Sequence, residues 1–101
     1  MTYAVRFTKE AEDDLLRLID FLIVQDLSAA RKAQASITEA VRFLTIFPFS
    51  CRKADGTTGN PFLRELLIPF GNAGYVALFE IDDANTVTIL AVRHQREDDY
   101  H

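Results

Sequence analysis

Apolar residues change from a helical spacing to a strand-like pattern on the two sides of Pro48. Before it, over residues 8–47, they recur every three or four positions, which places them on one face of a helix. After it, over residues 62–93, they form short runs separated by turn residues, which is typical of strands. The chain has 101 residues, enough for one domain with one core. The pattern therefore predicts a single α+β domain over residues 1–101, with a helical hairpin packed on one face of an antiparallel sheet.

Two helices are expected in the first half of the chain. The first begins at Thr8, whose side-chain oxygen can cap a helix, and ends near Asp26. Acidic residues crowd its first turns, where the helix dipole stabilises negative charge, so we interpret them as structural rather than metal-binding. The second helix begins at Ser28 and ends before Pro48, because a helix interior does not accommodate proline. With only a residue or two between them, the helices must run antiparallel.

Four strands are expected around the helices. One precedes them, over residues 3–7, and three follow, over residues 62–68, 75–81 and 87–93. The short turns between the last three predict an antiparallel meander. Both faces of the second and third strands are apolar, although the helices can cover only one. The other face would be partly exposed or covered by a partner, which is a first indication that the protein binds something.

Residues 48–61, rich in Pro, Gly, Ser and Thr, are expected to form the one long loop. This loop contains Cys51, the only cysteine, so no intramolecular disulfide can form. Arg52 and Lys53 follow directly and could lower the pKa of the thiol, as in a reactive cysteine. The alternative, a small and unreactive loop residue, is the more common role.

The formal net charge is −4 and the isoelectric point is about 5.0, which does not suggest a strongly basic, nucleic-acid-binding surface. Basic residues are nevertheless concentrated over residues 31–64, where a local basic surface could persist. The N-terminus lacks the pattern of a secretory signal, and no segment has the length of a membrane span. We therefore expect a cytoplasmic protein without a membrane partner.

Two stretches near the C-terminus carry a resemblance to a known family. Residues 64–81, RELLIPFGNAGYVALFEI, resemble the central hairpin of the ParE/RelE toxin superfamily. Residues 92–100, VRHQREDDY, are similar to its last strand and C-terminal motif. The upstream order of one strand and two helices ending at a proline also agrees. The resemblance implies a RelE/ParE-like fold, strand–helix–helix–strand–strand–strand, and a toxin that a cognate antitoxin holds inactive.

The superfamily has two branches with different mechanisms. RelE-like members cut messenger RNA at the ribosome, whereas ParE-like members poison DNA gyrase and are not known as hydrolases. RelE-like members are strongly basic and commonly carry an arginine after the Gly-Tyr that opens the third strand. Here the net charge is negative and Val76 occupies that position, where an apolar side chain cannot hold a scissile phosphate. The ParE-like branch is therefore favoured.

The resemblance and the residue types give five candidates for contact with the target: Arg64, Arg93, His94, Arg96 and Tyr100. In a nuclease, Arg64 and Arg96 would stabilise phosphate charge and Tyr100 would transfer a proton. The spacing of Arg96 and Tyr100 differs by one residue from that of the nuclease tail.

Each candidate also has a structural alternative. Arg64 could form an ion pair with a neighbouring strand, such as with Glu80, and His94 could be an ordinary surface or hydrogen-bonded residue. Arg96 could pair with Glu97, and Tyr100 could pack its ring against the sheet. The histidines and acids over residues 94–101 have no fixed geometry, so neither a metal site nor a cofactor is expected.

The leading hypothesis is a non-enzymatic toxin that inhibits DNA gyrase and is neutralised by its cognate antitoxin. The alternatives are a ribosome-dependent mRNA endoribonuclease and a non-toxic module that only binds an antitoxin. The expected partners are the antitoxin and gyrase, or the ribosome and mRNA in place of gyrase. Both a homodimer and a toxin–antitoxin hetero-oligomer stay open.

Overall fold

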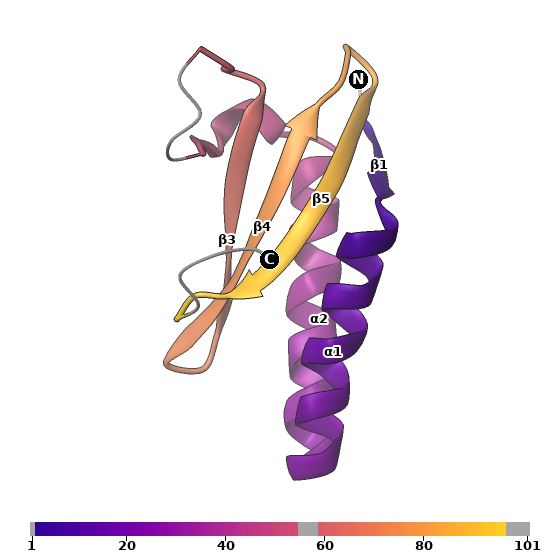
Figure 1. The fold of residues 1–101 in the computed structure, drawn as a ribbon, viewed down its shortest axis with the longest axis vertical. Helices are drawn as coiled ribbons and strands as arrows, with labels where there is room; N and C mark the ends of the chain where they lie inside the picture. The colour runs from indigo at the N-terminus through magenta and orange to yellow at the C-terminus, as the bar shows by residue number, and fades with distance from the viewer. Residues whose placement is uncertain (1, 55–58, 97–101) are drawn as a thin grey trace.

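The computed structural model describes residues 2–54 and 59–96, in which two helices cover one face of a five-stranded sheet (Figure 1). The elements in chain order are β1 (Ala4–Phe7), α1 (Lys9–Gln25), α2 (Leu27–Leu44), the 3-10 turn η1 (Pro48–Ser50), β2 (Arg52–Lys53), β3 (Leu63–Phe70), β4 (Ala73–Ile81) and β5 (Thr86–His94). The predicted α+β class, with a helical hairpin packed on a sheet, is confirmed. Within these residues, none of the helices combines the length and the hydropathy needed to cross a membrane.

The strands lie in the order β1-β5-β4-β3-β2, and β3, β4 and β5 form the predicted antiparallel meander. β1 pairs with β5 in parallel, with Val5 opposite Val87, so the sheet departs from a purely antiparallel arrangement at this edge. A parallel pair needs a long connection, which the helices and the meander provide here. The apolar pattern of a four-residue strand does not indicate which other strand it will pair with.

A single residue, Asp26, joins the two antiparallel helices. Its backbone N–H donates to the carbonyl of Leu22 at the end of α1, and its carboxylate accepts from the N–H of Ser28 at 2.9 Å. The predicted cap at Ser28 is therefore wrong, since Ser28 lies inside α2 and Asp26 is the cap. The predicted cap of α1 is confirmed, because the Thr8 side chain accepts from the N–H of Ala11 at 3.1 Å.

β3 continues through Pro69 to Phe70, beyond its predicted end. Among the described strands, only β2 lies outside β3, and it pairs with Arg64 and Glu65 alone. Pro69 therefore lies at a sheet edge, where a missing N–H breaks no ladder hydrogen bond. The turn into β4 has two residues, Gly71 and Asn72, and Gly71 has a φ of 61°, which glycine adopts without strain.

Residues 48–61 are predicted to form one long loop, but the described part of this segment contains two short elements. These are η1, which begins a few residues after α2, and β2, which adds a short fifth strand to the sheet. Residues 55–58 lie outside the described part of the chain.

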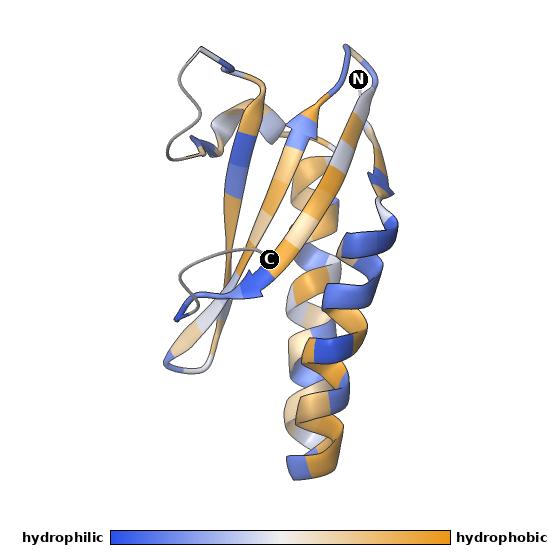
Figure 2. Cartoon of the chain, viewed as in Figure 1, coloured by the Kyte–Doolittle hydropathy of each residue, from blue (hydrophilic) through white to orange (hydrophobic). Residues whose placement is uncertain are grey.

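The core lies between the helices and the sheet. Phe79 and Val87 on the sheet are fully buried, as are Ala11 on α1 and Ala33 on α2, whose small side chains allow close packing. β3 changes along its length, from hydrophilic at Arg64 and Glu65 to hydrophobic beyond them (Figure 2). Its hydrophobic part is thus also the part that lies at the sheet edge.

Candidate functional site

Arg64 connects the start of β3 to the segment that follows α2. Its Nη1 donates to the carbonyl oxygens of Phe49 at 3.0 Å and Cys51 at 2.8 Å, and its Nε donates to that of Pro61 at 2.8 Å. The guanidinium also lies 5.3 Å from the centre of the Phe49 ring, a cation–π distance. In the described residues its partners are these carbonyls and this ring, and not Glu80.

Cys51 is buried beside Arg64. Burial raises the pKa of the Cys51 thiol to about 11, although the Arg64 guanidinium acts in the opposite direction. A thiol with this pKa is almost entirely protonated at neutral pH, so it is a poor nucleophile. Of the two alternatives open from the sequence, the structure supports the unreactive one, because desolvation outweighs the neighbouring charge.

Arg93, His94 and Arg96 lie together at the end of β5. The N–H of Arg96 donates to Nδ1 of His94 at 3.1 Å, and Nη1 of Arg93 donates to the carbonyls of His94 and Gln95 at 3.2 and 3.3 Å. The His94 ring packs edge-on against Tyr75, with ring centres 5.9 Å apart. Tyr100, the fifth candidate, lies outside the described residues.

Arg64 does not join this group. Its register partner on β4 is Phe79, whereas that of His94 is Tyr75, four residues away. Four residues of strand span about 13 Å, so Arg64 and His94 lie at different ends of the sheet. Arg93 lies opposite Val76, on the other face from Phe79, since side chains alternate along a strand. The candidates therefore form one cluster of chain neighbours at the end of β5, in which the Arg93 and His94 side chains lie on opposite faces of the sheet, and one separate arginine.

Val76 is only 2% exposed, although it lies on the sheet face that points away from the helices. Its cross-strand neighbours are Leu67 on β3 and Arg93 on β5. The position after the Gly-Tyr that opens β4 thus contributes an apolar, buried side chain.

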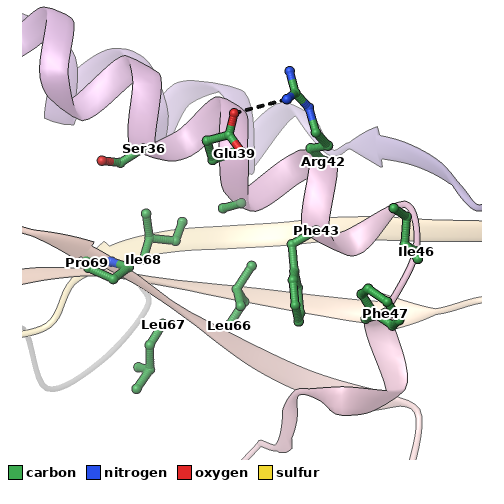
Figure 3. A pocket seen from close by; sticks show the side chains of 11 residues that line it. Ser36, Glu39, Arg42, Phe43, Ile46, Phe47, Leu66, Leu67, Ile68 and Pro69 are labelled. Carbon is green, nitrogen blue, oxygen red and sulfur yellow. Dashed lines mark ion pairs between the residues drawn. The ribbon is translucent and has the colours of Figure 1, made fainter.

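A groove of about 610 Å³ lies between α2 and β3 (Figure 3). Phe43 points from α2 towards β3, and its ring centre is 5.6 Å from that of Phe47. The lining is mostly apolar, with an exposed ion pair between Glu39 and Arg42 at 3.2 Å on one rim. The groove is lined by Ser36, Glu39, Ala40, Arg42, Phe43, Ile46, Phe47, Leu66, Leu67, Ile68 and Pro69, and we call it the α2–β3 groove.

The α2–β3 groove runs beside an open strand edge. Within the described residues, no strand pairs with the outer edge of residues 66–70, because the pairing of β3 with β2 ends at Glu65. Phe47 and Leu67 remain 53% and 46% exposed there. An open edge next to an apolar groove is the arrangement that accepts an added strand from a binding partner.

Sequence reasoning did not identify this groove. The apolar stripe of α2 that packs on the core runs through Ala33, Ile37 and Leu44, and it leaves out Phe43, Ile46 and Phe47. These three large apolar residues outside the stripe could have indicated the groove, because a side chain that does not face the core must lie on the surface or contact a partner.

Comparison with known proteins places this geometry in a family. Residues 5–99 match the family described as the ParE toxin of the type II toxin–antitoxin system parDE. Toxin RelE1 of Caulobacter vibrioides is 33% identical over 81 residues, which cover 80% of this chain and 82% of that protein. A structure of the chromosomal ParDE system from P. aeruginosa shares the fold, with a TM-score of 0.67 at 22% identity over 95% of this chain and 97% of the other. The chain therefore belongs to the ParE toxin family of type II toxin–antitoxin systems.

Proposed function

We propose that this toxin binds DNA gyrase and blocks it, without cutting RNA. The observation that carries the proposal is the burial of Val76, at the position where the nuclease branch commonly has an arginine. The separation of Arg64 from Arg93 and Arg96 supports it as well, because phosphoryl chemistry needs charges that converge on one point. The net charge of −4 adds to this, since a ribosomal nuclease must first approach a dense array of phosphates.

The competing function is a ribosome-dependent mRNA endoribonuclease with Arg64, Arg96 and Tyr100 in phosphate and proton-transfer roles. Two observations favour it: the cluster of Arg93, His94 and Arg96, and the name of the 33% identical relative, Toxin RelE1. Losing one group aimed at the transition state typically costs about 100- to 1,000-fold in rate. A nuclease without the arginine at position 76 would accordingly be slow.

A cognate antitoxin is implied by the family, and we propose the α2–β3 groove as its binding site. An extended apolar segment of the antitoxin would add to the open edge of β3 and place its side chains against Phe43, Phe47 and Leu67. Antitoxin binding would be driven by the removal of apolar surface from water, which contributes a free energy of about 25 cal/mol per Å². A toxin–antitoxin hetero-oligomer in the cytoplasm is then the expected resting state, with a homodimer of the toxin as the alternative.

The deciding experiment compares both targets with the same purified toxin. We expect inhibition in a gyrase supercoiling assay and intact transcripts in primer extension on translated messenger RNA. Codon-positioned cuts that disappear in Arg96→Ala, with supercoiling unaffected, would establish the nuclease instead. Normal growth of cells that express the folded chain alone, together with neither activity, would indicate a non-toxic antitoxin-binding module.

A further inference from the structure

A second pocket, of about 370 Å³, lies where the N-terminal segment, η1 and the β4–β5 turn meet. It is at the opposite end of β4 from Tyr75 and His94, and it shares no lining residue with the α2–β3 groove. Its volume falls within the range of about 300–1,000 Å³ that is usual for small-ligand sites. It is lined by Tyr3, Phe49, Phe62, Ile81, Asp82, Asp83 and Ala84, and we call it the Phe49–Phe62 pocket.

Two half-exposed aromatic rings line this pocket. Phe49 and Phe62 are 50% and 47% exposed, and they meet edge to face with ring centres 6.2 Å apart. The face of an aromatic ring has a partial negative charge and attracts cations. The chain itself already uses the Phe49 ring in this way, because the Arg64 guanidinium lies 5.3 Å from its centre.

Two carboxylates border the same pocket. Asp82 accepts a hydrogen bond from the Thr88 hydroxyl, and Asp83 accepts one from the N–H of Asn85 at 2.8 Å. An ionised carboxylate has about four acceptor positions, so each retains capacity for a further donor. Neither is part of a salt bridge among the residues that the structure describes.

Hydrogen bonds to backbone carbonyls hold the pocket in shape. The N–H of Ile81 donates to the carbonyl of Phe62 at 2.9 Å, and Arg64 donates to that of Phe49 at 3.0 Å. The N–H of Asp82 donates to the carbonyl of Thr86 at 2.9 Å and closes the β4–β5 turn. A ligand would therefore find most of the site already formed, which lowers the entropic cost of binding.

We propose that the Phe49–Phe62 pocket binds an arginine side chain of a partner protein. A guanidinium is planar and weakly hydrated, so it can stack on Phe62 or Phe49 while its N–H groups bond to Asp82 or Asp83. The compact, strongly hydrated lysine ammonium fits this combination of apolar floor and anionic border less well. The site is additional to the proposed gyrase and antitoxin contacts and depends on neither.

The test uses the whole chain, labelled with ¹⁵N and titrated with N-acetyl-arginine amide while amide chemical shifts are recorded. We expect saturable shifts at Phe62 and over residues 82–85, with a Kd of about 1–10 mM for so small a ligand at a half-exposed site. N-acetyl-citrulline amide has nearly the same shape without the charge and should bind at least about fivefold more weakly.

Two double variants distinguish binding in this pocket from a general attraction of the positively charged ligand to the negatively charged protein. The double variant Asp82→Asn/Asp83→Asn removes the charge but keeps an acceptor oxygen for each turn hydrogen bond, and should weaken binding about fivefold to tenfold. The double variant Glu10→Gln/Glu12→Gln makes the same change of charge on the exposed side of α1 and should leave binding unchanged. Equal shifts with citrulline or with N-acetyl-lysine amide, equal effects of the two double variants, or the absence of saturation would overturn the proposal.

Discussion

Asp14 on α1 and Val92 on β5 are joined by a buried hydrogen bond, in which Oδ2 of Asp14 accepts from the backbone N–H of Val92 at 2.9 Å. The bond lies where a neighbouring strand would otherwise be, since β1 ends at Phe7 while β5 continues past Ile89. Thr8 contributes to the same stretch, because its hydroxyl donates to the carbonyl of Leu90 at 3.0 Å. Side chains at the start of α1 therefore satisfy backbone groups of β5 that β1 is too short to reach.

Replacing Asp14 by alanine should destabilise the fold more than an ordinary surface change. The substitution leaves the buried N–H of Val92 without this acceptor, which typically costs about 1–3 kcal/mol. Urea denaturation should show a lower midpoint with an unchanged slope.

Two companion variants make the comparison specific. Asp14→Asn keeps an acceptor oxygen and should lose less stability than Asp14→Ala. Asp13→Ala removes an exposed partner of Lys9 on the same turn and should cost less than about 1 kcal/mol. If Asp13→Ala and Asp14→Ala are equally stable, the bond to Val92 contributes no more to stability than the exposed ion pair of Asp13 with Lys9.

Asp14 also illustrates what the sequence could and could not predict. The helices and the cap at Thr8 were predictable because they depend on residues within one turn of each other. Asp14 was grouped with its neighbours as a helix-dipole residue, yet it alone is buried, because β5 meets it across 78 positions of sequence. The parallel pairing of β1 and the α2–β3 groove could not be predicted for the same reason, since both depend on where distant segments meet.

Ionisation of Cys51 should make stability fall at alkaline pH. The ordinary pKa of the thiol is 9.0 and burial raises the folded pKa to about 11, so between these values the unfolded chain loses a proton that the folded chain retains. The unfolded state then binds fewer protons, and the free energy of unfolding decreases as pH rises from about 9 to 11. The effect is on the order of 2 kcal/mol over that interval.

Measurement of unfolding free energies at pH 8 and pH 11 tests this. Tyr75 also has a pKa raised by burial and contributes in the same direction, so the comparison is between the wild type and Cys51→Ala. The variant should show a clearly shallower decline with pH. Parallel declines would show that the Cys51 thiol ionises as readily in the folded chain as in the unfolded one.

The proposed antitoxin site predicts loss of binding without loss of fold. Phe47→Ser and Leu67→Ser remove apolar surface that is already about half exposed, so the thermal midpoint should change little. Affinity for the antitoxin, measured by calorimetry, should fall at least about tenfold, as expected for large side chains at the centre of an interface. Val24→Ser on α1 is the matched control, since Val24 is 87% exposed and does not line the groove. Similar affinities for all three variants would place the antitoxin elsewhere.

The cluster at the end of β5 gives the last prediction. Arg96 is exposed next to His94, and arginine is among the residues that contribute most at protein interfaces. Arg96→Ala should therefore raise the toxin concentration for half-inhibition of gyrase supercoiling at least about tenfold, a difference of about 1.4 kcal/mol. Arg31→Ala removes an exposed charge from α2 and should leave inhibition unchanged, which separates a specific contact from general electrostatics. Full inhibition by Arg96→Ala would contradict this prediction and show that the Arg96 side chain does not contribute to the gyrase contact.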